Sequence, residues 1–294
     1  MSTNWNVQGE TVIVTGGTKG IGYETSRGLA VLGATVVIVG RDTTRGNAAV
    51  ESMQQQTGNP NISFLQADIS ELSEVRHLVE YIITHYPQLH MLVNNAGGAN
   101  AQRKETTDGL ETTFATNHLS PFLLTNLLLP LLQASAPARI VNVNSLQHRS
   151  GHIDFDDLQS EKDYDLMSAY RQAKLANVLF TYELARRLSG TNVTVNAADP
   201  GGTLEGTKAV PLPLAVRLIL PLFSKWLTAE HAAQSSVYLA SSPDVERLSG
   251  KYVNFRKKIV RSSPASYDEA TAEKVWRVSA ELTGLEGKNL SHKA

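Results

Sequence analysis

The sequence predicts a single-domain α/β fold built on a doubly wound parallel sheet of about seven strands, with helices on both faces. Two observations carry this prediction. The first two-thirds of the 294 residues alternate short β-branched runs with longer helical patterns. The short runs are nearly continuous in apolar residues, as strands of a parallel sheet require when both faces are covered. No repeat and no Pro-, Gly- or Ser-rich linker divides the chain, so the domain is expected to span residues 1–294.

The strands are expected where these apolar runs occur, and a run near the end of the chain could be a seventh. They are Thr11–Val14, Thr35–Val39, Ile62–Leu65, Met91–Val93, Arg139–Val143, Asn192–Asn196 and Lys251–Phe255.

Helical patterns fill the intervals between the strands, and glycines follow three of them at the position where helices commonly end. The expected helices are Ile21–Leu32, Thr43–Gln56, Leu72–Tyr86, Thr116–Leu132 and Ser168–Leu188, and the terminal glycines are Gly33, Gly58 and Gly190. Repeated strand–helix units with right-handed crossovers give a doubly wound sheet. Residues 8–145 are then the nucleotide-binding half and residues 146–294 the catalytic and substrate half.

The composition excludes several classes of function. The formal net charge of −1 gives no reason to expect a nucleic-acid partner. With no cysteine, disulfides, thiolate nucleophiles and cysteine-ligated metals are excluded. No apolar run reaches the length of about 18 residues that a transmembrane helix needs, and the polar start Met1–Asn6 predicts no signal peptide. A cytoplasmic location is expected; weak peripheral membrane contact and homo-oligomerisation stay open.

A glycine-rich loop follows the first strand and leads into the first helix, as in Rossmann-type nucleotide sites. The segment Thr15–Gly22 has the spacing Gly-x-x-x-Gly-x-Gly, which differs from the common G-x-G-x-x-G pattern. Glycines let the backbone approach a pyrophosphate, and the helix N-terminus offers free N–H groups. A plain glycine-rich turn is the alternative. The expected cofactor contacts from this loop are Gly16, Thr18, Lys19, Gly20, Ile21 and Gly22.

The end of the second strand favours NADP(H) over NAD(H). An NAD site usually places an acid there to bind the ribose 2′-hydroxyl, but this strand ends in Gly40 followed by Arg41. Arg41 and Lys19 are cations that can bind a 2′-phosphate. Asp42 argues the other way, although its side chain could cap the following helix. Asp68, followed by Ile69, could meet the adenine edge or cap a helix, and the sequence leaves both roles open.

Tyr170 and Lys174 lie four residues apart on an expected helix and therefore share one face. A phenol with an ordinary pKa near 10 is a poor acid or base at neutral pH. A nearby ammonium favours the phenolate, so the pair could move a proton on or off a substrate oxygen. Alone, this spacing also fits a solvated helix face.

Together these segments resemble the short-chain dehydrogenase/reductase family over nearly the whole chain. The matching motifs, in order, are Thr15–Gly22, Asp68–Ile69, Asn94–Gly97, Asn117, Ser145, Tyr170 with Lys174, and Pro200–Gly201. Four longer strings resemble the retinol dehydrogenase branch: Thr116–Thr125, Lys174–Phe180, Leu248–Tyr252 and Thr271–Trp276.

The resemblance implies a division of labour among four catalytic residues. Tyr170 would be the general acid in carbonyl reduction, and Lys174 would lower its pKa and bind the nicotinamide ribose. Ser145 would hold and polarise the substrate oxygen, since donors aimed at an oxygen that gains charge stabilise the transition state. Asn117 would kink its helix and anchor a water in the proton relay. The cofactor cleft would be lined by Asn94, Asn95, Ala96 and Gly97, and by Pro200, Gly201 and Thr203.

The chain also departs from the branch pattern. Asp199 stands where a histidine usually precedes the Pro-Gly pair, and Glu205 stands where a hydroxyl residue is usual, with Thr203 and Thr207 as candidate replacements. An acidic insertion, Gly151–Met167, separates Ser145 from Tyr170 and is expected to be a solvated loop.

The segment Leu204–Leu227 is rich in Leu, Pro and Val and lies where the family places its substrate lid. A lid of this composition would favour small apolar carbonyl or alcohol substrates, retinoid-like ones among them, and exclude water; a buried core helix is the alternative. His118, His148 and His152 have no metal-ligand spacing, so structural or exposed roles are expected and no metal site is predicted.

These features favour an NADP(H)-dependent carbonyl reductase or alcohol dehydrogenase. A sugar-nucleotide epimerase or dehydratase is disfavoured by the glycine spacing. A non-catalytic NADP(H)-binding regulator is disfavoured by the intact catalytic set. A protochlorophyllide reductase is disfavoured because its pigment site uses cysteines.

Overall fold

A computed structural model describes residues 6–202 and 228–285 of the chain. Its centre is a seven-stranded sheet in the order β3-β2-β1-β4-β5-β6-β7, in which every neighbouring pair is parallel. The predicted doubly wound sheet is therefore confirmed. The strands are β1 Thr11–Thr15, β2 Thr35–Gly40, β3 Ile62–Gln66, β4 Met91–Asn94, β5 Ala138–Val143, β6 Val193–Ala198 and β7 Tyr252–Val253.

The last strand is shorter than the predicted run Lys251–Phe255 because the chain turns back on itself. Val253 forms an antiparallel bridge with Ile259. The Asn254 side chain accepts hydrogen bonds from the N–H groups of Arg256 and Lys258, both at 3.0 Å. An amide that bonds its own following backbone favours a turn, and it ends the strand here.

The five predicted helices are present with ends shifted by at most a few residues, except that one of them is divided. Helices α1 Gly20–Val31, α2 Thr43–Thr57, α3 Leu72–His85 and α6 Leu166–Arg187 match the prediction. The expected helix Thr116–Leu132 is instead a short helix α4 Thr112–Phe114, a π-helical turn η1 Ala115–Leu119 and helix α5 Ser120–Ala134. Elements not predicted are η2 Leu146–Ser150, α9 Ala229–Ser241, η4 Pro243–Val245, η5 Pro264–Tyr267 and α10 Glu269–Leu282.

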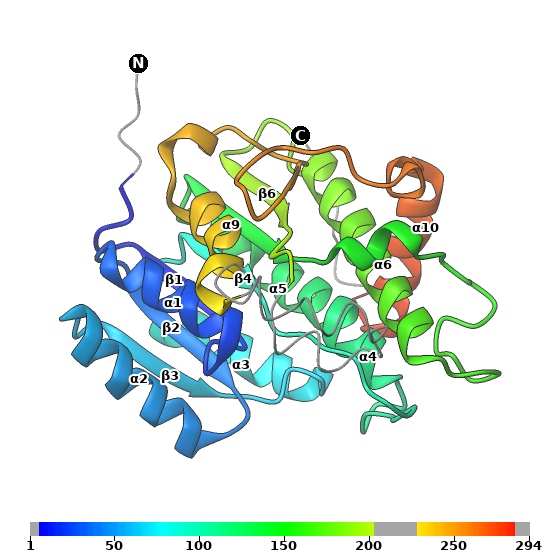
Figure 1. Ribbon diagram of the computed structural model, residues 1–294, viewed down its shortest axis with the longest axis horizontal. Helices are drawn as coiled ribbons and strands as arrows, with labels where there is room; N and C mark the ends of the chain where they lie inside the picture. Colours follow the sequence, from blue (N-terminus) through cyan, green and yellow to red (C-terminus); the bar gives the residue numbers. More distant parts are fainter. Residues whose placement is uncertain (1–5, 203–227, 286–294) are drawn as a thin grey trace, which may run out of the picture.

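Helices cover both faces of the sheet, as Figure 1 shows. Alternate residues of β1 separate the two layers: Val12 and Val14 pack with the side chains of α1, α2 and α9, and Ile13 packs with those of α3, α5 and α6. Helix α10 lies outside α6, where Trp276 meets Phe122 at a ring-centroid distance of 5.0 Å. Both faces are thus buried, which explains the continuous apolar strands.

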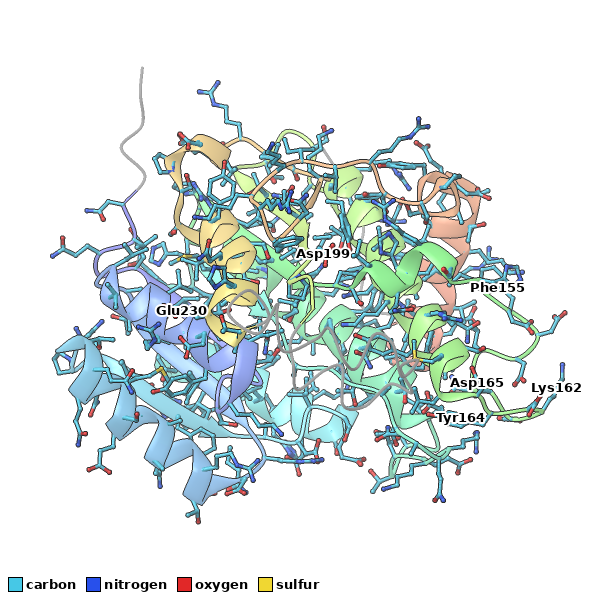
Figure 2. The ribbon with its side chains drawn as sticks, in the orientation of Figure 1. Phe155, Lys162, Tyr164, Asp165, Asp199 and Glu230 are labelled. Atoms are coloured by element: carbon cyan, nitrogen blue, oxygen red, sulfur yellow. The ribbon has the colours of Figure 1, made fainter. Side chains whose placement is uncertain are left out.

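The acidic insertion Gly151–Met167 is mostly irregular, as expected, but it is anchored at several points. Ile153 is buried, and the Tyr164 hydroxyl donates to the Asn100 carbonyl at 2.8 Å. Asp165 caps α6 by accepting from the Ser168 N–H group. Figure 2 shows Lys162 and Tyr164 on this loop at the margin of the molecule, far from Glu230 at the start of α9.

The predicted lid Leu204–Leu227 lies outside the described residues, as do Thr203, Glu205 and Thr207. In the part of the chain that the structure describes, no helix is both long enough and apolar enough to cross a membrane. Nor do the described residues contain a cluster of acidic, histidine or cysteine side chains that could hold a metal ion.

Candidate active site

The predicted site residues converge where the carboxyl ends of four central strands meet. The loops after β1, β4, β5 and β6 carry the glycine-rich segment, Asn95–Gly97, Ser145 and Pro200–Gly201 respectively. Successive strands are added to the sheet in one direction from β1 to β3 and in the other from β4 to β7. The order therefore reverses between β1 and β4, which are neighbours in the sheet but not in sequence. Open α/β sheets bind ligands at this switch point.

The glycine-rich loop forms a tight cradle at the start of α1. Gly16 has φ +67°, and a Cβ atom on Gly22 would lie 2.2 Å from the Gly16 carbonyl oxygen. Lys19 is the N-cap residue of α1 but makes no side-chain capping hydrogen bond, so among the described residues no side chain caps the N–H groups of the first turn. A bare helix N-terminus behind a glycine loop fits the pyrophosphate of a dinucleotide.

The loop after β4 is tied to this cradle by Thr15. Its hydroxyl accepts hydrogen bonds from the N–H groups of Asn95 at 3.0 Å and Ala96 at 3.1 Å. The Asn95 amide donates back to the Thr15 carbonyl at 2.9 Å. Asn94 was expected to line the cleft, but it is 2% exposed and bonds to Thr125 and Asn142 inside the fold. That expectation was wrong, because the last residue of β4 still points into the core.

The end of β2 places Arg41 at the surface. Its side chain is 78% exposed, and Nη1 lies 3.6 Å from Oδ2 of Asp68. Asp42 caps α2 by accepting from the Arg45 N–H group at 3.0 Å, as the sequence analysis suggested. Asp68 bonds to the N–H and hydroxyl groups of Ser70 and does not cap α3, whose N-cap residue is Glu71.

Asn117 sits in the π-helical turn and reaches across to the loop after β4. Its side-chain amide donates to the Gly98 carbonyl at 2.7 Å, and its Oδ1 accepts from the Gly98 N–H group at 3.2 Å. It also donates to the Thr113 carbonyl at 2.7 Å within its own helix. A Cβ on Gly97 would lie 2.5 Å from the Asn117 Oδ1 atom and 3.3 Å from the Lys174 Nζ atom. These contacts bring Gly97, Asn117 and Lys174 together.

Tyr170 and Lys174 share one face of α6 beside Ser145, as predicted. The Lys174 Nζ atom lies 5.7 Å from the centroid of the Tyr170 ring and donates to the Val143 carbonyl at 3.1 Å. Lys174 is 3% exposed, and this burial lowers its pKa to about 8.

The pKa of the Tyr170 phenol is raised, contrary to the sequence expectation. Burial raises it most, a hydrogen bond with Ser145 opposes this, and the negative charge of Asp199 raises it further. Desolvation of the phenolate is therefore the stronger influence, and the Lys174 ammonium does not reverse it.

Asp199 directly follows β6 beside this pair, and Figure 2 shows it near the middle of the molecule. The carboxylate is 1% exposed, and its Oδ1 accepts from the Gly201 N–H group at 2.9 Å. Its Oδ2 atom and the buried Tyr252 hydroxyl make no hydrogen bond of normal geometry among the described residues. The two groups still influence each other, since the pKa of Tyr252 is raised by burial and then by the Asp199 charge.

The three histidines lie as expected, in structural or exposed places: His118 and His148 are buried, and His152 is exposed. His118 bonds to Ser279 of α10, and His148 bonds to Ser262. Ser262 and Tyr252 belong to this neighbourhood but were not predicted, because they come from segments more than 100 residues away in the chain. No local sequence signal marks them.

A glycine cradle suited to a pyrophosphate, beside the half-buried Tyr170 and the buried Lys174, defines a dinucleotide-dependent oxidoreductase as the class of protein. Comparison with known proteins agrees. The family model for short chain dehydrogenases matches residues 10–210. Retinol dehydrogenase 12 of Bos taurus is 44% identical over 284 residues, which is 96% of this chain and 89% of the bovine protein. Human retinol dehydrogenase 14 is 40% identical over 95% of this chain and 88% of its own.

A solved structure shares both the fold and part of the sequence. The crystal structure of an uncharacterised protein from Mycobacterium paratuberculosis matches with a TM-score of 0.78 and 33% identity, covering 95% of each chain. The chain therefore belongs to the short-chain dehydrogenase/reductase family and is retinol dehydrogenase-like, as the resemblance implied. Enzymes of this family use NAD(P)(H) and act on small carbonyl or alcohol compounds.

Proposed function

We propose that this protein is an NADP(H)-dependent oxidoreductase that interconverts an apolar aldehyde or ketone with its alcohol. The observation that carries the proposal is the convergence of Ser145, Tyr170, Lys174 and Asn117 beside the glycine cradle. The same edge of the sheet would thus hold a dinucleotide and present side chains that can transfer a proton, which a binding protein alone would not need.

The residues of the chain fit a nicotinamide dinucleotide. The Gly16–Gly22 cradle and the uncapped N-terminus of α1 suit the pyrophosphate. The loop Asn95–Gly97 lines the path towards Lys174, which would hold the nicotinamide ribose. Pro200 and Gly201 stand at the far end of the site, after β6. When bound, the nicotinamide supplies or accepts the hydride.

The phosphorylated form of the cofactor is favoured by the end of β2. Gly40 provides no acid for a ribose 2′-hydroxyl, and a Cβ there would lie 2.8 Å from the Thr18 methyl group. Arg41 and Lys19 are exposed cations at this edge of the cradle. Arg41 can exchange its 3.6 Å contact with Asp68 for a 2′-phosphate, because an exposed ion pair in water contributes only about 0–1 kcal/mol.

Proton transfer would fall to Tyr170. A phenol whose pKa is raised keeps its proton at neutral pH and can donate it to the oxygen of a carbonyl substrate. Ser145, whose side chain opposes the rise in the pKa of the phenol, would hold the same oxygen. Lys174, with a pKa of about 8, remains mostly charged at neutral pH and stabilises negative charge that develops near the phenol.

The experiment is a panel of apolar and polar carbonyls and alcohols, followed by NADPH absorbance, with cofactor titrations alongside. We expect NADPH to bind at least about tenfold more tightly than NADH, since each charge-assisted contact contributes ~1.5–3 kcal/mol. Arg41→Ala should remove this preference. Tyr170→Phe should lower kcat by about a hundredfold or more with NADPH affinity largely kept. Turnover above a tenth of wild type in Tyr170→Phe, or equal affinity for both cofactors, would contradict the proposal.

A further inference from the structure

His148 lies directly behind Ser145 and contacts its backbone. The ring is fully buried, at 0% exposure, in the η2 turn that begins after Ser145. Its Nδ1 atom is 2.6 Å from the Ser145 carbonyl oxygen. A carbonyl oxygen only accepts hydrogen bonds, so Nδ1 carries the proton and donates it.

The other ring nitrogen is held by a distant segment of the chain. The Nε2 atom lies 2.7 Å from the Ser262 hydroxyl. Burial lowers the pKa of His148, which favours the neutral ring, so Nε2 is unprotonated and accepts from Ser262. Ser262 is itself fixed, because its N–H group donates to the Tyr267 hydroxyl at 2.8 Å.

The plane of the ring is fixed as well. The His148 ring packs on Tyr252 of β7 at a centroid distance of 4.7 Å and an interplanar angle of 44°. Contacts at both nitrogens and on one face leave a single orientation. The Ser145 backbone is held from the other side by its own N–H group, which donates to the Asn144 Oδ1 atom at 2.8 Å.

We propose that His148 is a positioning residue for Ser145, and that the Ser262 hydroxyl holds the His148 ring in the orientation in which Nδ1 donates to the Ser145 carbonyl. The proposal rests on the proposed function, in which the Ser145 hydroxyl holds the substrate oxygen. A misplacement of about 1 Å in such a group can lower a rate a hundredfold. Loops position reacting groups less well than helices or strands do unless a supporting layer fixes them, and Ser145 lies on a loop.

Three variants separate positioning from packing. His148→Phe keeps a ring against Tyr252 but has no side-chain donor for the Ser145 carbonyl, which then accepts only from the N–H group of residue 148, at 3.2 Å in the wild type. His148→Asn places an amide N–H group close to the position of Nδ1 and keeps that donor. Ser262→Ala leaves the ring intact and removes the hydroxyl that donates to Nε2. His152→Phe, at an exposed histidine four residues along the same loop, is the matched control.

We expect His148→Phe to lower kcat by about ten- to a hundredfold, with NADPH affinity within about twofold of wild type because the cradle lies on another strand. His148→Asn should recover most of this loss. The kcat of Ser262→Ala should lie between those of the wild type and His148→Phe. His152→Phe should behave as wild type. Equal losses in His148→Phe and His148→Asn, or wild-type kcat in His148→Phe, would overturn the proposal.

A readout that does not depend on turnover distinguishes this inference from the proposed function. Nitrogen-15 NMR of labelled histidine should show His148 as the neutral Nδ1–H tautomer in the wild type, and the Nε2 resonance should shift in Ser262→Ala because its hydrogen-bond donor is lost. An inactive wild type with this tautomer pattern would reject the proposed function and keep the arrangement around Ser145. An Nε2–H tautomer or a charged ring at neutral pH in the wild type would overturn the positioning role, even if His148→Phe failed to fold.

Discussion

The buried histidine beside Asn117 makes the fold sensitive to mild acid. His118 is 0% exposed and lies among aromatic rings, with Phe114 at a centroid distance of 5.1 Å. Ser279 of α10 donates its own proton to the Val275 carbonyl and accepts from Nε2 of His118, each at 2.7 Å. The Nδ1 atom has no hydrogen-bond partner within the described residues, so His118 is the neutral Nε2–H tautomer.

The size of the effect follows from the pKa. Burial lowers the pKa of His118 from 6.5 to about 3. Below pH 6.5 the unfolded chain binds a proton that the folded chain does not, so the free energy of unfolding falls as the pH is lowered through this window. The contribution of His118 to the free energy of unfolding falls by about 1.4 kcal/mol between about pH 7.5 and pH 5.5. It falls by about 1.4 kcal/mol for each further unit by which the pH is lowered, until the pKa of the folded state is approached.

The assay is urea unfolding of the wild type and His118→Phe across this pH range. Phenylalanine fills a similar volume and does not titrate, and Ser279 keeps its bond to Val275. The difference in the free energy of unfolding between the two proteins should therefore shift by about 1.4 kcal/mol in favour of His118→Phe at the lower pH, whereas His152→Phe should show no such shift. A constant difference between wild type and His118→Phe would mean that His118 takes up a proton in the folded state, which would refute the buried neutral assignment.

Two further predictions concern the catalytic half. Lys174→Ala should lower both the NADPH affinity and kcat, because Lys174 would contact the ribose and stabilise charge at Tyr170; Lys174→Met fills the buried volume without the charge, so full activity in Lys174→Met would contradict this role. For the segment Leu204–Leu227, kcat/KM should rise up to about fourfold for each carbon added to an aldehyde series, at ~0.8 kcal/mol per buried CH₂. Polar replacements at Leu218 or Phe223 should flatten that rise without changing NADPH affinity. If kcat/KM of the wild type did not change along the series, the proposal that the substrate is apolar would be contradicted.

The strands and most helix ends could be predicted because their signals are local. Continuous apolar runs marked the strands, and the glycine that ends α2, Gly58, adopts the left-handed conformation its position suggested, with φ +70°. The kink around Asn117 has no local signal and was expected only from the family resemblance. The structure shows it as a π-helical turn, in which Asn117 hydrogen-bonds to Gly98, 19 residues away in the sequence.

The candidate site shows the same distinction between local and distant causes. The positions of Ser145, Tyr170 and Lys174 followed from motif spacing on predicted elements. The surroundings of Ser145 did not, since Ser262 and Tyr252 reach it only through the folded arrangement of β7 and the segment after it. Asn94 was misassigned for a related reason: the sequence marks the end of β4, but the direction of its side chain depends on the partners Thr125 and Asn142.

The electrostatics of Tyr170 depend on burial more than on its sequence neighbour. The sequence places an ammonium one helical turn away, which alone would lower the pKa of the phenol. In the fold, Lys174 donates to the Val143 carbonyl, while burial and the Asp199 charge both raise the pKa of Tyr170. The buried carboxylate of Asp199 therefore works against the phenolate that alcohol oxidation would need and in favour of the protonated phenol that carbonyl reduction would use. Asp199, a departure from the branch pattern, thus adds to the effect of burial on Tyr170 and opposes the effect expected from Lys174.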